Sequence, residues 1–505
     1  KTQLTGRLQY ETTIAQNHNI GAMFVYSEEY WHTRSTGASR NDRIHPSTSE
    51  INAALTNVQS NSGSSASEGL RSYIGRMNYS AYDKYLLEFS FRVDGSSKFI
   101  KGHQYGFFPT VAVGWRFTEE EFLKKYLSSW LSSGKLRASW GKLGDNSGVD
   151  RFEQLETLTA MNYMSSDVVK GFVNKKMINK DLSWEVSTDI NVGLDLGFLN
   201  NRLRTEIDFY NRLRTGMNRP SQMSIHLTGA YSAPRANIGD LLNRGLELNL
   251  TWKDKIGNVE YSVNLNGAYN RTVLKEWNEF LSRGWVYLDM PYHFLYVYEN
   301  NGIAQTWQDI YNNTPQGLSP GDVIRKDLNG DGIIDGKDKK AYPNIQRDRP
   351  TTTYGITLQA AWKGFDISML FNGGLGRKDF WLTDFNNTAF ADRRYASTWD
   401  HWTEPWSLEN RGGEWPRLGT STDRSDNSYW LYNMNYLRMK NIMLGYNLPK
   451  KLLSKISMTN LRIYASAENL FTVTQYPGLD PEKKNSARDL YPINRSFSIG
   501  LNVSF

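Results

Sequence analysis

The sequence predicts an all-β fold, a large antiparallel β-barrel that crosses a membrane and of which about fifteen strands are present. Three observations lead to this prediction: strict alternation of apolar and polar residues along many segments, connections that alternate between short and long, and a polar composition rich in aromatic residues. Alternation with period two sends successive side chains to opposite faces of a strand. Each strand can therefore turn an apolar face to lipid and a polar face to the interior of a barrel.

The alternation is clear in residues 242–253, where Leu246, Leu248 and Leu250 alternate with Glu247 and Asn249. The same pattern predicts strands at residues 3–12, 17–28, 70–80, 83–93, 106–117, 134–142, 186–197, 202–213, 242–253, 258–270, 352–362, 364–373, 435–447, 459–469 and 495–505.

The connections between these strands alternate between short and long. Bacterial outer-membrane barrels show the same alternation, with short periplasmic turns and long extracellular loops. Short turns are expected at residues 80–83, 198–202 and 253–258, and short helices at residues 118–133 and 448–458. Long extracellular loops are expected near residues 29–69, 143–185, 214–241, 271–351, 374–434 and 470–494.

The odd number of predicted strands and the sequence of the last strand lead to two further expectations. Single-chain bacterial barrels have an even strand count with both ends on the periplasmic side, so an odd count predicts earlier strands on another stretch of polypeptide. The last ten residues, SFSIGLNVSF, place Phe497, Ile499, Leu501, Val503 and Phe505 on one face. This ending on an aromatic residue resembles the terminal-strand signal by which outer-membrane barrels are recognised for assembly.

Composition narrows the protein class. No apolar run approaches the roughly 18 residues of a transmembrane helix, which excludes a helical membrane protein. A mean hydropathy of −0.59 is compatible with a barrel, because only alternate residues face lipid. The absence of Cys excludes disulfide scaffolds and Cys nucleophiles. The net charge of +7 is spread along the chain, whereas a nucleic-acid surface would be clustered, so no nucleic-acid partner is expected.

Several segments resemble, in order, those of the SusC/RagA family of TonB-dependent outer-membrane transporters. One of them, WEVSTDINVGLDLGFLNNRLRTEIDFYNRLRTGM, is similar to the family's most recognisable hairpin. The segments with this resemblance are residues 135–148, 184–217, 237–252, 436–453, 461–482 and the terminal strand.

The resemblance implies a barrel of about 22 strands around an N-terminal plug, in the bacterial outer membrane. It also implies a SusD-like surface lipoprotein as a lid, energy from TonB, contact with outer-membrane lipid, and import of a glycan or sometimes a peptide. No plug and no TonB-contacting segment are found in residues 1–505, which are therefore expected to form the C-terminal portion of the barrel.

The segment DLNGDGIIDGKD has the spacing of a calcium loop. Short carboxylates at alternate positions can converge on a hard cation, Gly332 allows a sharp turn, and a backbone carbonyl adds a further oxygen. The predicted structural Ca²⁺ ligands are Asp327, Asn329, Asp331, Ile333, Asp335 and Asp338. The last position is Asp in place of the usual Glu, which shortens its reach, and a hydrophilic turn without metal, or one that holds Mg²⁺ or Na⁺, stays open as an alternative.

Tryptophans cluster in residues 381–430, inside one long predicted loop. Trp399, Trp402 and Trp406 are weak candidates for stacking on sugar rings, and the alternative is that they pack the loop or meet the lid protein. Aromatics near strand ends, such as Tyr85 and Trp115, are expected to form interfacial girdles.

No enzyme is expected, because the seven His residues are scattered, no G-x-S-x-G elbow is present and no phosphate-binding loop is complete. Two other functions stay open from the residues alone. The first is a cell-surface adhesin or glycan-binding protein built from soluble β-domains, and the second is a secreted polysaccharide hydrolase, for which no motif is found.

Overall fold

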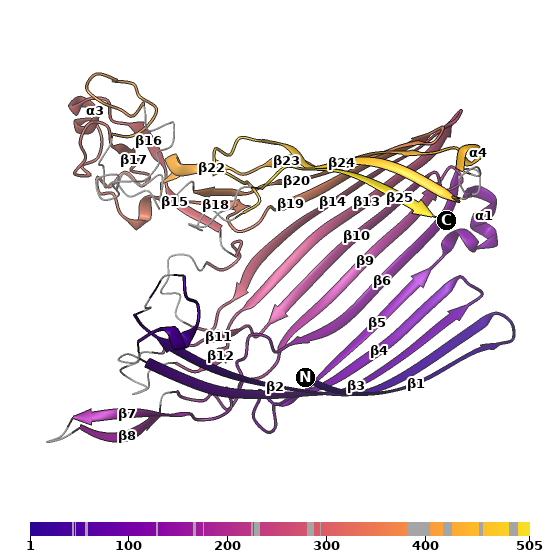
Figure 1. The fold of residues 1–505 in the computed structure, drawn as a ribbon, viewed down its shortest axis with the longest axis horizontal. Helices are drawn as coiled ribbons and strands as arrows, with labels where there is room; N and C mark the ends of the chain where they lie inside the picture. Colours follow the sequence, from indigo (N-terminus) through magenta and orange to yellow (C-terminus); the bar gives the residue numbers. More distant parts are fainter. Residues whose placement is uncertain are drawn as a thin grey trace.

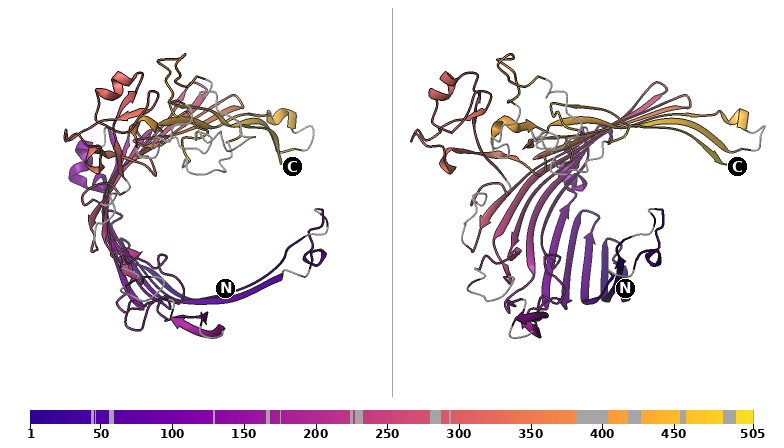
Figure 2. Two further views of the ribbon diagram at one scale, coloured as in Figure 1. Left: turned by 90° about the vertical axis from the view of Figure 1, so that its left-hand side faces the viewer. Right: turned by 60° about the vertical axis from the view of Figure 1, so that its left-hand side comes forward.

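The chain folds around one long antiparallel sheet of fifteen strands, which curves into an open arc with β1 (Thr2–Ile14) and β25 (Ser496–Ser504) as its two edges (Figures 1 and 2). The structure is a computed structural model. It describes residues 1–42, 45, 47–55, 59–127, 130–164, 168–174, 176–223, 226, 233–279, 287–292, 294–380, 404–417, 427–453, 458–483 and 493–504.

Each of the fifteen predicted strands is present, and each pairs with the next in chain order. Between the two edges the sheet contains β2 (His18–Arg40), β3 (Gln59–Ala81), β4 (Tyr85–Ser96), β5 (Tyr105–Trp115), β6 (Leu131–Asp145), β9 (Glu185–Phe198), β10 (Leu203–Thr215), β13 (Asp240–Ile256), β14 (Val259–Glu276), β19 (Thr352–Trp362), β20 (Phe365–Leu375), β23 (Tyr436–Asn447) and β24 (Asn460–Thr474).

The register aligns apolar residues into rows across the sheet. Leu136 of β6 pairs with Leu194, Leu194 with Ile207, and Ile207 with Leu248 of β13. Paired residues point to the same face, so these four side chains form one continuous row. Leu136 is 42% exposed and Leu248 is 41% exposed, because no other part of the described chain covers this face. An uncovered apolar face of this length is what a lipid-facing barrel wall requires.

The sheet has two different rims. At the short-turn rim, on the right of Figure 1, tight turns join β1 to β2, β3 to β4, β9 to β10 and β13 to β14, and the helices α1 (Glu121–Leu127) and α4 (Lys450–Leu453) lie there. Residues 199–201 in one of these turns have positive φ angles. The long-connection rim lies on the left of Figure 1, and the short strands of the long connections lie there.

Within the described residues, short strands and one short helix lie at the long-connection rim or lead into it (Figure 1). They are β7 (Leu158–Met164), β8 (Val168–Asn174), β11 (Asn218–Pro220), β12 (Arg235–Asn237), β15 (Phe294–Tyr298), β16 (Asn300–Ile303), α3 (Trp307–Tyr311), β17 (Val323–Arg325), β18 (Lys339–Gln346), β21 (Lys378–Phe380) and β22 (Leu431–Asn433).

Two predicted boundaries are wrong. The loop expected at residues 29–69 is mostly a paired hairpin, because β2 continues to Arg40 and β3 begins at Gln59. Its Ser- and Gly-rich ends lack apolar alternation, yet the ladder uses only backbone groups and continues regardless of side chains. The helix expected at 118–133 contains α1 but ends before Leu131, since residues from Leu131 onward already pair with β9. Of the helix expected at 448–458, α4 is present, and residues 454–457 lie outside the described residues.

Among the described residues, no helix is long and apolar enough to cross a membrane. In β25 the apolar side chains of Phe497, Ile499 and Leu501 are between 63% and 85% exposed, on one face of the strand. Phe505, the predicted last residue of that face, lies outside the described residues.

The two faces of β13 give a test of the fold. Leu248→Arg should destabilise the folded barrel by about 2–4 kcal/mol, because a charge near the bilayer midplane would face hydrocarbon. Glu247→Arg, on the opposite face, should be much milder. Urea unfolding in lipid vesicles measures both variants, and equal losses would contradict the assignment of the faces.

Candidate functional site on the concave face and its rim

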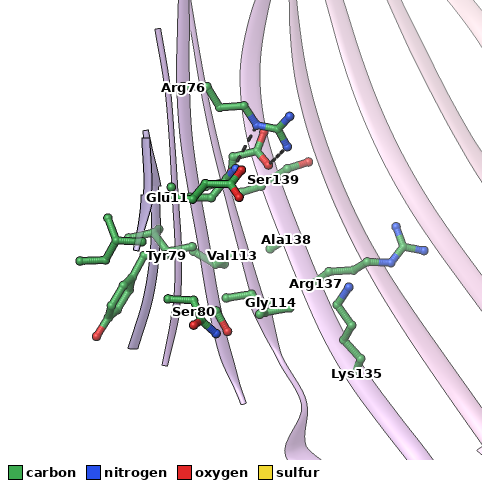
Figure 3. A pocket seen from close by; sticks show the side chains of 18 of the residues that line it. Glu11, Arg76, Tyr79, Ser80, Val113, Gly114, Lys135, Arg137, Ala138 and Ser139 are labelled. Atoms are coloured by element: carbon green, nitrogen blue, oxygen red, sulfur yellow. Dashed lines mark hydrogen bonds and ion pairs between the residues drawn. The ribbon is translucent and has the colours of Figure 1, made fainter. Parts of the chain in front are cut away.

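The concave face of the sheet is polar and carries a broad hollow of about 850 Å³ that spans β1 to β9. Figure 3 shows side chains from neighbouring strands converging on it, among them Glu11, Arg76 and Arg137. Arg76 donates to Glu88 at 2.6 Å and to Asn78 at 3.2 Å. A single hollow reaches across so many strands because the sheet curves around it, and the polar rows of the register all point into it.

A second ion pair on this face crosses a whole strand. Arg137 of β6 donates through both terminal nitrogens to the Asp208 carboxylate of β10, at 2.8 and 2.6 Å, and through Nε to Asp195 at 3.0 Å. Gly193 of β9 is paired in register with both Arg137 and Asp208. A Cβ at Gly193 would lie 2.6 Å from Arg137 Cζ and 2.8 Å from Asp208 Oδ1. The bridge therefore requires glycine at this position.

The same arrangement occurs on the concave face near the C-terminal edge of the sheet. Arg462 of β24 reaches over β23 to Asp366 of β20, with an Nη2–Oδ2 distance of 2.5 Å and an Nε–Oδ1 distance of 3.0 Å. Gly445 lies beneath, and a Cβ there would meet Arg462 Nη2 at 2.5 Å. Two independent Arg–Gly–Asp bridges thus tie three strands each on the concave face.

The concave face consequently offers paired charges, amides and hydroxyls. Asn264 donates to Asn249 and Thr251 at 2.7 and 2.8 Å, which continues the polar rows across β13 and β14. These groups can hydrogen-bond a polar molecule that lies against this face. The aromatics Tyr85 and Trp115 lie on the other face near the short-turn rim and both donate to the Glu120 carboxylate, at 2.6 and 3.2 Å.

The predicted calcium loop lies between β17 and β18 at the long-connection rim. Its hub is Asp338, whose fully buried side chain accepts backbone N–H groups of Leu328 at 2.9 Å and Asp335 at 2.8 Å. These hydrogen bonds, that from Asp335 first, hold the pKa of Asp338 below its usual range. Asp327 accepts the N–H of Gly332 at 2.9 Å, so the carboxylate at the first loop position closes the sharp turn.

The remaining predicted ligands are spread around this loop. Asn329 and Asp331 bond to each other, Ile333 is 64% exposed, and Asp335 accepts the Lys337 N–H at 2.8 Å. Among the residues that the structure describes, no group of three or more His, Cys, Asp or Glu side chains is arranged to hold a metal ion. The structure thus brings the loop together through its own N–H groups, and Ca²⁺ binding stays a prediction.

The structure describes only one of the three tryptophans predicted as candidates for sugar stacking. Trp399 and Trp402 lie outside the described residues. Trp406 is only 7% exposed and packs against Gly321, so little of its ring is open to a sugar. Trp430 is buried with Leu295, Val297 and Phe380 in a small hydrophobic core of the long-connection rim. For these described tryptophans the side chains pack the rim.

A buried charged cluster beneath this rim was not foreseen from the sequence. Arg377 is 2% exposed and donates to the carbonyl oxygens of Arg347, Pro481, Glu482 and Lys483 at 3.0 to 3.1 Å. Arg438 of β23, 3% exposed, donates to Asp480 at 2.7 Å and also pairs with Glu482.

The cluster fastens the segment after β24 to β21 and to the end of β23. Arg438, inside the strand expected at residues 435–447, and the acidic PGLDPE segment were the signals that the sequence offered. Their meeting depends on strands that are distant in sequence.

The Arg137 bridge gives a second test. Gly193→Ala should destabilise the protein by about 1–3 kcal/mol, because the methyl group displaces the guanidinium from Asp208. The loss should be clearly smaller when Arg137→Ala is present as well, since the guanidinium is then gone and Asp208 is the only one of the two side chains still close to the new methyl group. Gly267→Ala is the matched control, because its Cβ would find no atom closer than 3.8 Å. Urea unfolding of the four variants measures the coupling, and additive losses would contradict the bridge.

Residues 1–316 match a family model described as TonB dependent receptor-like, beta-barrel. TonB-dependent receptor P3 of Formosa agariphila is 30% identical over 476 residues, which cover 86% of this chain and 45% of that protein. TonB-dependent receptor SusC of Bacteroides thetaiotaomicron is 30% identical over 456 residues, covering 86% of this chain and 44% of that protein. The chain spans about half the length of the curated relatives it matches.

Among solved structures, a structure of the RagAB peptide transporter aligns with a TM-score of 0.83 and 23% identity, over 100% of this chain and 55% of that chain. The RagAB peptide importer in its open-open state aligns with a TM-score of 0.81 and 24% identity, over 100% of this chain and 54% of that chain. At this identity the likeness concerns the fold, and it confirms the predicted architecture of the sheet.

Proposed function

Because the chain belongs to the TonB-dependent receptor β-barrel family, whose members lie in the outer membrane, we propose that it forms wall strands of an importer for a large nutrient. The proposed cargo is a glycan or a peptide, the energy comes from TonB, and a SusD-like surface lipoprotein is the partner at the long-connection rim. The family is one of receptors and not of enzymes, in agreement with the sequence.

The observation that carries the proposal is the division of the sheet into two chemically different faces. The row from Leu136 to Leu248 faces outward and is uncovered, while Arg137, Asp208 and their neighbours face the concave side. A wall of this kind can stand between lipid and a polar interior. A soluble adhesin gains nothing from a long uncovered apolar face, so the structure favours the transporter over that alternative.

The charges of the concave face are suited to passage of polar cargo. Arg76, Arg137 and Arg462 each have a carboxylate partner within 2.6 Å. Paired charges leave a weak net field, so a cargo of either sign is neither held strongly nor repelled. Relatives support the cargo classes only by their names: one is a SusC, and the fold neighbour is a peptide transporter.

Growth of a strain without this receptor tests the proposal. The deletion strain should fail to grow on one class of polymeric glycan or peptide as sole nutrient, and should recover with the full receptor. Disruption of TonB coupling should abolish that recovery, because the proposed import needs external energy. Unchanged growth on every polymer tested, with the receptor shown to be expressed beforehand, would contradict import.

We further propose that residues 327–338 bind a structural Ca²⁺. The spacing of the oxygen-bearing residues, the turn at Gly332 and the ionised state favoured at Asp338 support this proposal. The bound ion would stiffen the rim and would take no part in a chemical step.

Addition of about 1 mM Ca²⁺, the range of weak extracellular calcium modules, should slow amide hydrogen exchange in residues 327–340 relative to EGTA. Asp331→Asn should remove the effect, because it deletes a ligand charge. Asp42→Asn, which changes an exposed aspartate elsewhere on the same rim, should preserve it. Identical exchange with Ca²⁺ and with EGTA would count against a calcium loop.

A further inference from the structure

A second cavity, of about 650 Å³, lies on the concave face where β9, β10 and β13 reach the long-connection rim. Strand residues form its floor, and the connections around β11 and after β18 form its wall. It lies at the mouth of the passage described above, where a cargo from outside arrives first. Six lining residues carry its chemistry: Glu185, Arg214, Asn218, Asn243, Gln346 and Arg349.

The lining holds five arginines and four carboxylates. Arg214 pairs with Glu185 and with Asp145, the latter at 3.2 Å, so its guanidinium is shared between two carboxylates of the lining. Arg349 is exposed and makes no hydrogen bond or ion pair with another residue that the structure describes. Its guanidinium is therefore open to an anionic group of a ligand.

Oε1 of Glu185 is ion-paired with Arg214, and besides it three polar side-chain atoms of this lining are buried without a hydrogen-bond partner in the described part of the chain. They are Nδ2 of Asn218, Nε2 of Gln346 and Oδ1 of Asn243, and both Asn218 and Gln346 are 5% exposed. A buried polar group without a partner is costly, so native proteins seldom keep one that nothing satisfies. Two of these atoms need an acceptor and one needs a donor.

A hydroxyl group can both donate and accept a hydrogen bond. A polyhydroxylated ligand can therefore supply the two acceptors and the one donor that these three atoms lack. Among the described residues that line the cavity, the only aliphatic side chains are Met217 and Leu241, and Met217 is 3% exposed. A peptide with apolar side chains would find few partners here. The guanidinium of Arg349, for which the described residues supply no partner, adds a preference for a carboxylate.

We propose that this cavity is a recognition site for an acidic oligosaccharide, with sugar hydroxyls on Asn218, Gln346 and Asn243 and a carboxylate on Arg349. The inference rests on the proposed import function and names its cargo class. At the mouth of the proposed passage, this site would select for acidic cargo. The ion pairs of Arg76, Arg137 and Arg462 farther inside give no such selectivity.

Binding of a defined probe to the full receptor tests the site. Oligogalacturonate, its methyl-esterified neutral counterpart of equal length and a Glu-rich hexapeptide are titrated into the detergent-solubilised receptor by calorimetry. Oligogalacturonate should bind about tenfold more tightly than the methyl ester, and Arg349→Ala should remove most of that difference, since one charge-assisted contact is lost. Arg34→Ala, at an exposed arginine of the same rim outside the cavity, should change nothing.

Equal affinities for the acid and its ester, tighter binding of the hexapeptide, or no effect of Arg349→Ala would overturn the site. These outcomes are separable from failure of import itself. Acid-selective binding that depends on Arg349 in a receptor whose deletion leaves growth unchanged would sink the import proposal and keep the site. If the receptor supports TonB-dependent growth on a polymer and Arg349→Ala leaves that growth unchanged, the import proposal would stand and the site would be overturned.

Discussion

A strand that crosses lipid must find hydrogen-bond partners for its backbone on neighbouring strands, because hydrocarbon offers none. The fifteen-stranded ladder answers that constraint, and much of the remaining structure follows from it. Since the ladder is made by the backbone, side chains are left free to specialise by face. Apolar rows such as Leu136 to Leu248 are left uncovered toward lipid, and polar rows gather on the concave side.

Pairing also brings side chains of next-nearest strands within reach wherever the strand between them carries glycine. Arg137 passes over Gly193 to Asp208, and Arg462 passes over Gly445 to Asp366. A glycine inside a strand ordinarily weakens it, because it loses more conformational freedom and packs no side chain. In these two places the ion pair across three strands offsets that cost and fixes the register.

The long-connection rim follows different physics, since it stands in water and can build a core of its own. Leu295, Val297, Phe380 and Trp430 form such a core, and it joins segments on both sides of residues 381–403. Beneath it, the buried Arg377 and Arg438 use carbonyl and carboxylate oxygens to fasten the rim to the sheet. A buried arginine is tolerated there because several oxygens surround each guanidinium. Within the described residues, the rim is thus packed around its own core and tied to the sheet by buried arginines.

The sequence by itself determined the strands, their order and which face of each is apolar, because period-two alternation is a local property that survives any tertiary arrangement. It also indicated the family, through segments such as residues 184–217. It could not place the ends of β2 and β3, whose Ser-rich tips pair through the backbone alone. Nor did it show the bridge from Arg137 to Asp208, the cluster at Arg377 or the cavity at Asn218 and Gln346. Arg137 and Asp208 are 71 positions apart, and Arg377 and Lys483 are 106 positions apart. Only the curvature and register of the folded sheet bring such side chains together.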